Sequence, residues 1–286
     1  MAEFSDYQAE KYKWITAFDK KFYPDHFEKA LSHYRPFIKR FHKLTTIATS
    51  SEHLFRLIQE EKNPPRVQLL RIFNRYVSPI TSVEMLKVIG NTNDICTAFG
   101  PLFRDIALVK ENFATKKRDD VLAALLFEHK ERGQFGYELT ERFFKWFEET
   151  FPGPEFAALG PRRAGKDIDL KKVIEGYQHD CPTDILISYD GEPLVAGFAR
   201  YDSDRGGAQE DDRTGGNRSK ILEIIEHKNE KGKPLKIFFL NDGPGLLLGS
   251  MWSDYGRLEK MHPDRILVAT LKMLQSRFTR DWLLGR

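Results

Sequence analysis

The sequence has few of the features that would place a protein outside the cell or in a membrane. Its only two cysteines, Cys96 and Cys181, cannot form a disulfide framework and do not have metal-ligand spacing. No apolar run reaches about 18 residues, so a transmembrane helix is not expected. The opening residues contain no apolar stretch of the kind found in a secretory signal. We therefore expect a cytoplasmic protein in a reducing compartment, with no membrane partner.

The motifs of several enzyme classes are also missing. The phosphate-loop pattern GxxxxGK[ST] is absent, which argues against nucleotide hydrolysis. The eight histidines are scattered and show no zinc-ligand spacing. His179, Asp180 and Cys181 are adjacent, but the side chains of adjacent residues diverge and do not form a nucleophilic triad. We therefore exclude cysteine hydrolases and zinc enzymes.

What is present is typical of an ordinary globular chain. Of the 286 residues, 41% are hydrophobic, 13% aromatic and 30% charged. The net charge of +3 is only mildly basic and does not by itself indicate a nucleic-acid-binding protein. Positive charge is concentrated in KKR at 116–118 and in PRRAGK at 161–166. Each cluster is either a solvated surface or a set of phosphate contacts.

Residues 1–130 have the pattern of a helical region. Apolar residues recur there at three- and four-residue spacing, which predicts amphipathic helices. Serine, threonine and proline residues mark several expected helix starts. The aromatic residues of the region are predicted to form its core. The predicted helices cover 27–44, 50–61, 64–77 and 119–133, with a further start at Thr81 or Ser82.

After Gly133 the pattern changes to alternating helices and strands. A β-hairpin is expected where two apolar strands flank a turn at Gly191-Glu192 or nearby. The order of elements predicts an α/β domain over residues 131–286. In chain order the elements are a helix at 137–151, an extended piece at 156–160, strands at 183–190 and 193–202, a polar glycine-rich segment at 203–220, a helix at 220–232, a strand at 235–242 with a turn at 243–245, and a closing helix at 263–284.

One carboxylate stands at the start of the first hairpin strand. Asp184 directly precedes the apolar run ILI. A carboxylate in this position is costly to bury unless it binds something, and Mg²⁺ is a cation that takes carboxylate oxygens. The alternative is an aspartate that caps a turn.

Residues 134–245 resemble the PD-(D/E)XK nucleases, and specifically the type II restriction endonucleases. In that family a helix that contributes a glutamate precedes three strands, and a further helix and strand follow. The second strand opens with a P-D element, which matches Pro182, Thr183 and Asp184. KIFFLNDGPG resembles the strand and turn of some GATC-cutting members, and SDR at 203–205 resembles an element of tetrameric enzymes that read CCGG-type sites. The resemblance implies a mixed sheet flanked by helices, Mg²⁺ as cofactor and double-stranded DNA as substrate.

The sequence departs from the family in the third strand. VAGFARY has neither the acid nor the lysine of the acid-x-lysine motif, and Arg200 can orient water or stabilise phosphate but cannot lose its proton. Glu226-His227-Lys228 matches the motif literally, but it lies in an expected helix, where alternate side chains point apart. Asp202 shares a strand face with Arg200. In some relatives the second acid moves to the following helix or loop, where this chain has Glu210, Asp211 and Asp212. We therefore predict a catalytic set of Asp184, Glu210, Asp212 and Arg200, with Asp184 and Glu138 as metal ligands.

Residues around this set are predicted to contact DNA. Asn and Gln side chains pair with adenine and Arg side chains pair with guanine, while clustered cations contact phosphates. The predicted DNA-contacting residues are Arg205, Gln209, Arg213, Asn217, Arg218, Arg162, Arg163 and Lys166.

The leading hypothesis is a type II restriction endonuclease that acts as a homodimer matched to the symmetry of its site. The helical region would then supply dimer contacts, contacts to the DNA backbone, or both. A second hypothesis is a nuclease-like protein that binds DNA or a partner without cutting. A third is a helical scaffold with a small α/β cap and no role with nucleic acids.

Overall fold

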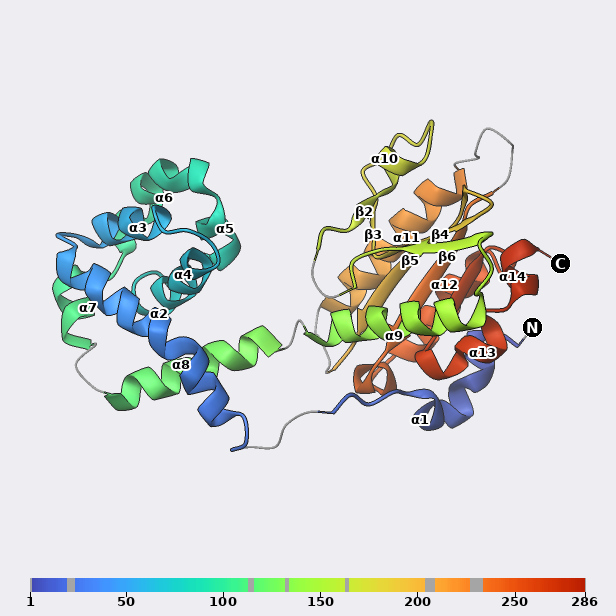
Figure 1. Cartoon of the computed structure of the whole chain (residues 1–286), viewed down its shortest axis with the longest axis horizontal. Helices are drawn as coiled ribbons and strands as arrows, with labels where there is room; N and C mark the ends of the chain where they lie inside the picture. The colour runs from blue at the N-terminus through green and yellow to red at the C-terminus, as the bar shows by residue number, and fades with distance from the viewer. Residues whose placement is uncertain are drawn as a thin grey trace. The chain divides into compact units, whose positions relative to one another are not determined.

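A computed structural model describes residues 2–19, 24–112, 116–131, 134–162, 165–203, 209–226 and 234–285. The chain divides into two compact units: Lys20–Glu131 forms one, and Met1–Asp19 packs with Arg132–Arg286 to form the other. We call them the helical unit and the sheet unit. The helical unit is thus an insertion into the sheet unit, whose N-terminal segment (dark blue) lies beside the C-terminal elements (red) in Figure 1.

The second boundary falls close to the expected division at 130/131, but the first 19 residues differ from the prediction. They were assigned to the helical region, whereas their contacts are with the sheet unit. The reason is the burial of Phe4, which is fully inaccessible and stacks on Trp252 with 4.3 Å between ring centroids. This aromatic contact joins residues far apart in the sequence, so local patterns could not reveal it.

The helical unit consists of seven α-helices among its described residues. The predicted start signals are used: the side chain of Ser50 accepts the N–H of His53, that of Ser82 accepts the N–H of Met85, and Pro65 opens its helix. The helices are α2 (Phe27–Ile47), α3 (Ser51–Gln59), α4 (Pro65–Tyr76), α5 (Val83–Lys87), α6 (Thr92–Phe99), α7 (Ile106–Asn112) and α8 (Lys116–Glu131), with 3-10 turns η2 (Ile89–Asn91) and η3 (Gly100–Leu102).

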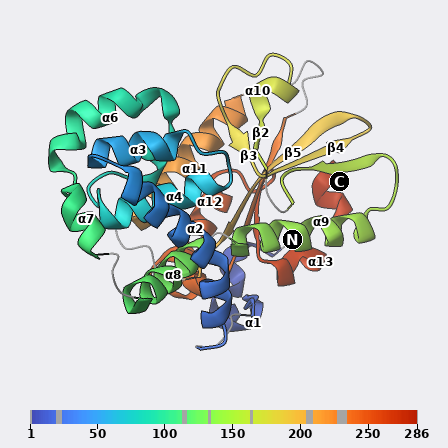
Figure 2. The ribbon, with the colours of Figure 1, turned by 60° about the vertical axis from the view of Figure 1, so that its left-hand side comes forward.

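The long helix α2 forms the spine of the helical unit. It packs against α8, as Figure 2 shows, and against α3 and α4. The hydroxyl of the buried Tyr34 donates a hydrogen bond to the carbonyl of Leu126 at 3.2 Å, which joins α2 to α8. The core contains buried aromatic side chains, among them Phe41, Phe55 and Phe73, as the aromatic density of this region predicted.

The sheet unit is built on a five-stranded mixed sheet in the order β1-β4-β5-β6-β7. Strands β1 (Phe156–Leu159), β4 (Ile185–Tyr189) and β5 (Glu192–Tyr201) pair antiparallel, and β6 (Lys236–Asp242) and β7 (Ile266–Ala269) continue the sheet parallel to β5. In the chain, three short elements come between β1 and β4. Strands β2 (Ile168–Asp169) and β3 (Pro182–Thr183) pair as a separate two-stranded sheet, and the short helix α10 (Leu170–Val173) follows β2. The α/β class with a mixed sheet flanked by helices is thus confirmed.

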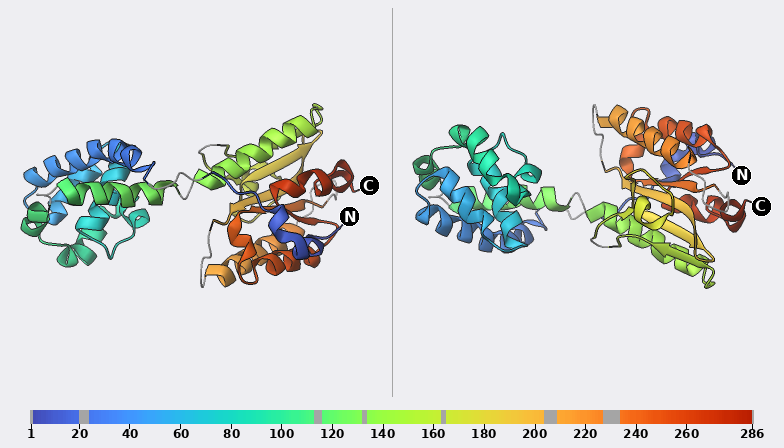
Figure 3. Two further views of the ribbon diagram at one scale, coloured as in Figure 1. Left: turned by 90° about the horizontal axis from the view of Figure 1, so that it is seen from below. Right: turned by 90° about the horizontal axis from the view of Figure 1, so that it is seen from above.

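Helices cover both faces of the sheet. Figure 3 shows α9 (Gln134–Thr150) on one face and α11 (Gln209–Glu226) and α12 (Met251–Met261) on the other. Phe143 of α9 contacts Phe238 of β6 with 5.4 Å between ring centroids. The next residue, Phe239, points to the opposite face, where it stacks on Phe198 of β5 at 5.6 Å. Alternate residues of β6 therefore fill the two halves of the core.

The expected hairpin is β4–β5. Its turn is Asp190-Gly191, one residue earlier than predicted, and both residues have positive φ, 49° and 80°. Positive φ at both central positions is the signature of the type I′ turn, which suits the twist of paired strands.

Two predicted elements of the sheet unit are wrong. Residues 263–284 do not form one helix: they contain the buried strand β7, the turn η5 (Leu271–Met273) and the short helices α13 (Leu274–Arg277) and α14 (Arg280–Leu284). The glycine-rich segment 203–220 is not all loop, because α11 begins at Gln209. Helix α12 was not predicted. The other elements outside the sheet are η1 (Phe4–Glu10), α1 (Lys11–Trp14) and η4 (Pro244–Leu247).

No helix in the part of the chain that the structure describes is both long enough and apolar enough to cross a membrane.

A buried ion pair fixes the N-terminal segment to the sheet unit. Glu259 and Arg277 are 3% and 2% exposed, and their side chains meet at 2.7 Å. The Glu259 carboxylate also accepts the N–H groups of Phe4 and Val268, at 2.6 and 2.9 Å. One side chain thus joins η1, α12 and β7.

We expect Glu259→Gln to lower the free energy of unfolding by about 3–5 kcal/mol, because the Arg277 charge would remain buried without its partner. The measurement is equilibrium unfolding in urea. Glu138→Gln is the matched control, since it removes an exposed pair with Arg142 in the same unit and should cost less than about 1 kcal/mol. Equal losses in the two variants would contradict the prediction.

Candidate functional site around Asp184

Asp184 lies directly before β4, where the backbone of β5 orients it. Its N–H donates to the carbonyl of Gly197 at 3.0 Å, and its carboxylate accepts the N–H of Ala199 at 2.9 Å. The buried hydroxyl of Thr183 donates to the same Gly197 carbonyl at 2.6 Å. The P-T-D segment is therefore fixed against β5, and the carboxylate makes this one hydrogen bond within the described residues.

Two charged side chains influence the carboxyl group of Asp184. Burial is the main cause that raises the pKa of its carboxyl group, and the nearby carboxylate of Asp167 raises it further. The Ala199 N–H and the ammonium group of Lys220 lower this pKa, but they do not outweigh burial. Lys220 belongs to α11, and its Nζ lies 4.2 Å from the centroid of the Phe198 ring. Asp184, Phe198 and Lys220 thus lie on the face of the sheet that α11 covers, and Asp167 is near enough to act on Asp184.

Two buried polar side chains lie near Lys220. Tyr177 and Cys181 are 4% and 1% exposed, and each influences the pKa of the other. Burial raises the pKa of both the phenol and the thiol, and Glu223 of α11 acts in the same direction. Cys181 therefore stays a neutral thiol and is a weak nucleophile. These groups pack the segment 165–182 against α11.

Arg200 and Asp202 form an ion pair at the end of β5. The Nε of Arg200 lies 2.8 Å from a carboxylate oxygen of Asp202, which is 3% exposed. This agrees with the expectation that the two share a strand face. Arg200 is on the same face of β5 as Phe198, two residues away, so it stands next to the region of Asp184.

Glu138 does not lie beside Asp184. It pairs with Arg142 on α9 at 2.5 Å, and α9 covers the face of the sheet opposite to α11. The expected role of Glu138 as an outer metal ligand therefore has no support from its position.

The candidate acids of the polar glycine-rich segment are on a helix. Glu210, Asp211 and Asp212 occupy the first turn of α11, with Gln209 and Arg213, and their side chains lie outside what the structure describes. Asn217, half-buried, and Arg218, exposed, lie on the same helix as Lys220.

The remaining predicted DNA contacts are scattered. Arg162 pairs with Glu148 and lies 4.9 Å from the Phe144 ring centroid, and Lys166 is exposed next to Asp167. Glu226, the last residue of α11, is exposed. Arg163, Arg205, His227 and Lys228 lie outside the described residues.

Sequence reasoning missed Lys220 and Asp167. Lys220 is the first residue of the predicted helix 220–232, and a lysine there is an ordinary surface residue by pattern. It reaches Asp184 only because α11 crosses the sheet between the parallel strands β5 and β6. Asp167 sits in a basic segment, where one acid carries no pattern signal.

The carboxylates around Asp184 are potential oxygen ligands for Mg²⁺. The described residues contain no group of three or more His, Cys, Asp or Glu side chains arranged to hold a metal ion. Mg²⁺, however, is usually bound by one or two carboxylates, with water and substrate phosphate as the other ligands. The carboxylate of Asp167 raises the pKa of Asp184, and a cation bound to Asp184 would relieve this repulsion. The pair therefore fits Mg²⁺ bound together with a phosphate.

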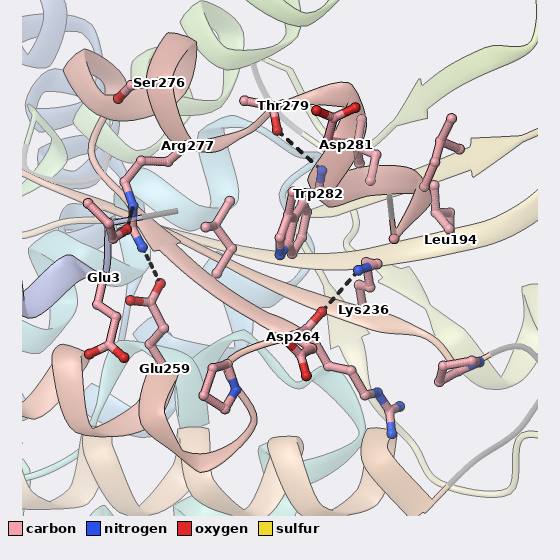
Figure 4. Close-up of a pocket in the computed structure, with 18 of the residues that line it drawn as sticks. Glu3, Leu194, Lys236, Glu259, Asp264, Ser276, Arg277, Thr279, Asp281 and Trp282 are labelled. Atoms are coloured by element: carbon pink, nitrogen blue, oxygen red, sulfur yellow. Dashed lines mark hydrogen bonds and ion pairs between the residues drawn. The ribbon is translucent and has the colours of Figure 1, made fainter.

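A pocket lies at the ends of the strands opposite to Asp184. It is a pocket of about 1160 Å³ bordered by the starts of β5, β6 and β7 and by α14 (Figure 4). Its cations are engaged within the protein: Arg277 pairs with Glu259, and Lys236 donates to the carbonyl of Asp264 at 3.0 Å. Burial lowers the pKa of Lys236, whose ammonium lies 5.0 Å from the Trp282 ring centroid. Arg277 and Lys236 therefore have structural roles at this pocket.

Comparison with protein-family models, curated proteins and solved structures finds no match to this chain. The evidence for a function therefore lies in the fold and in the side chains around Asp184.

The raised pKa of Asp184 links its ionisation to the free energy of unfolding. Because the folded state binds the Asp184 proton more tightly than the unfolded state, ionisation of Asp184 destabilises the fold as the pH rises above about 4. Asp184→Asn keeps an oxygen for the Ala199 N–H and removes the charge. We expect it to raise the free energy of unfolding at neutral pH by on the order of 1 kcal/mol.

This gain should vanish near pH 3, where both states of the wild-type protein carry a protonated Asp184. Urea unfolding of both proteins across that pH range measures it. A variant that is less stable than the wild type at pH 7 would contradict the prediction.

Proposed function

We propose that the protein is a Mg²⁺-dependent endonuclease that hydrolyses double-stranded DNA, of the type II restriction kind. The observation that carries the proposal is the half-buried Asp184 at the start of a central strand, with Lys220 over the neighbouring Phe198 and the charge of a second carboxylate, Asp167, close enough to act on it. Such a group has the parts that phosphodiester hydrolysis requires: ligands for a divalent cation and a positive charge for the phosphate.

The order of elements supports the same proposal. A helix (α9) precedes three antiparallel strands (β1, β4, β5), and a helix (α11) and a parallel strand (β6) follow. This is the order implied by the resemblance to PD-(D/E)XK nucleases, and P-T-D opens the second of the three strands. The small β2–β3 sheet and α10 are an insertion between the first two strands. The order of elements supports the fold, whereas the proposed chemistry depends on the side chains around Asp184.

In the proposed reaction each residue has a distinct task. Asp184 and Asp167 hold Mg²⁺, which when bound polarises the scissile phosphate and activates a water molecule. The N–H of Ala199 binds one oxygen of Asp184 and so fixes the position of the carboxylate against β5. Lys220 offsets the negative charge that develops on the phosphate in the transition state.

Lys220 compensates for the departure in the third strand. β5 has Phe198 and Arg200 where an acid and a lysine were expected, and Arg200 is engaged with Asp202. The ammonium of Lys220, which lies over Phe198, approaches the same region from α11 instead. Glu210 and Asp212 at the start of α11 remain candidates for the second acid.

DNA binding without cleavage is the second candidate. It is favoured by the small number of carboxylates: within the described residues only Asp167 accompanies Asp184, and Asp167 is exposed. For both candidates we propose double-stranded DNA as the ligand. A homodimer would match the two-fold symmetry of a short duplex site.

The test is cleavage of long unmethylated duplex DNA in Mg²⁺, with EDTA as the metal-free control. We expect discrete fragments with the wild-type protein in Mg²⁺ and none in EDTA. Asp184→Asn should lower the cleavage rate at least about 100-fold while DNA binding persists, and Lys220→Met should lower it to a similar extent, because each removes a charge used in the transition state.

The matched control is Asp180→Asn, which removes an acid that is 84% exposed and pairs with Lys171 in the same insertion. Its rate should equal that of the wild type. Binding without cleavage by the wild-type protein, on several DNA templates, would favour the second candidate. Equal rates for Asp184→Asn and wild type would refute the assignment of the site.

A further inference from the structure

The two units of the chain differ in the sign of their charge. The helical unit contains 19 Lys and Arg residues and 13 Asp and Glu residues, a formal net charge of +6. The sheet unit contains 26 and 29, a formal net charge of −3. The mildly basic net charge of the whole chain is therefore the sum of a basic unit and an acidic unit. Excess positive charge on one unit attracts polyanions to it.

Within the helical unit, positive charge is aligned along α2. Arg35, Lys39 and Lys43 are exposed and follow one another at four-residue spacing, which places them on one face of the helix. At 1.5 Å per residue the row is about 12 Å long. Within the described residues none of the three forms an ion pair, whereas the neighbouring Arg40 is paired with Glu61 at 2.5 Å.

A second basic segment joins this row at its C-terminal end. His42 of α2 lies 3.4 Å from Asp119 of α8, which fixes the start of α8 beside the end of the row. The three residues before Asp119 are Lys116, Lys117 and Arg118, the first turn of α8. The fold thus brings the KKR segment and the α2 row together, although they are more than 70 residues apart in the sequence.

We propose that the basic surface formed by Arg35, Lys39 and Lys43 of α2 binds the phosphate backbone of duplex DNA. A duplex carries one negative charge per about 1.7 Å of its axis, so a row of about 12 Å faces several phosphates. Contacts to the phosphate backbone supply affinity without sequence preference.

Charge and composition favour nucleic acid over an anionic membrane. Helices that lie on membranes place Trp, Phe or Leu beside their cations, to insert into the lipid. The exposed positions of α2 between and beside these cations are Ser32, Pro36, Arg40, Thr46 and Ile47, so a single large apolar side chain accompanies the row. The choice of DNA rests on the proposed function, but the surface belongs to a different unit from Asp184 and can be tested separately.

The experiment measures binding of the full-length chain to a short fluorescent duplex by anisotropy, in EDTA so that no cleavage occurs, at several salt concentrations. Arg35→Gln/Lys39→Gln/Lys43→Gln is expected to weaken binding at least about tenfold at ~0.1 M salt. The slope of log affinity against log salt should fall by roughly 2 to 3, because each lost phosphate contact removes about 0.9.

The matched control is Lys145→Gln/Lys171→Gln/Lys260→Gln, which removes the same three charges from exposed lysines of the sheet unit. It should bind with the affinity and slope of the wild type. Because all six side chains are exposed, both variants should unfold at the wild-type temperature, and that measurement verifies that they fold.

Equal affinity and slope in the two triple variants would overturn the proposal. So would a loss of binding to phosphatidylserine vesicles without any change in DNA binding. Failure of the proposed nuclease function has a different signature: the wild-type chain would bind DNA through this surface and leave it intact in Mg²⁺.

Discussion

The carboxylate of Asp242 is the constraint on which the sheet unit depends. Asp242 ends β6, is fully buried and accepts three backbone N–H groups: those of Thr16 at 2.7 Å, Gly243 at 2.7 Å and Leu271 at 2.9 Å. One side chain thus joins the N-terminal segment, the turn after β6 and the exit of β7. A buried carboxylate is costly without such partners, so the three segments and the charge stabilise one another.

This anchoring explains how a helical unit can be inserted near the start of the chain. The hydroxyl of Tyr201 continues the attachment, since it accepts the N–H of Phe18 at 3.0 Å and donates to the carbonyl of Thr16 at 3.1 Å. The chain therefore leaves the sheet unit from a fixed point beside the end of β5. Each unit has its own hydrophobic core, so the two can differ in charge and composition without a shared packing constraint.

Local patterns predicted most of the helices and the central hairpin, because caps, spacing and turn residues act over a few positions. They failed where tertiary context decides. The apolar run ILVA is equally compatible with a helix and a buried strand, and only pairing with β6 makes it β7. The segment around Gly215 and Gly216 was predicted to be a loop, yet it is helical. A side chain at either position would meet nothing within 4 Å, so the glycines only weaken the helix by about 1 kcal/mol each.

The candidate site was predictable only in part, for a related reason. Asp184 could be found because its neighbours in sequence mark the start of a strand. Lys220 and Asp167 lie on other elements, and only the crossing of α11 and the β2–β3 insertion bring them to it. Glu138 was expected at the site because of its place in the element order, but its helix covers the other face of the sheet.

Asp184 and Asp242 are both aspartates at the end of a strand, yet their surroundings differ. Asp242 is fully buried, which raises the pKa of its carboxyl group, but three N–H donors from the protein itself bind its oxygens, so its role is structural. Asp184 has one such donor within the described residues, an acidic neighbour in Asp167 and a single nearby lysine. A half-buried carboxylate with so few partners lowers stability unless another positive group binds to it. This shortage of hydrogen-bond donors and positive groups is the physical reason for proposing that Asp184, and not Asp242, binds a cation together with a phosphate.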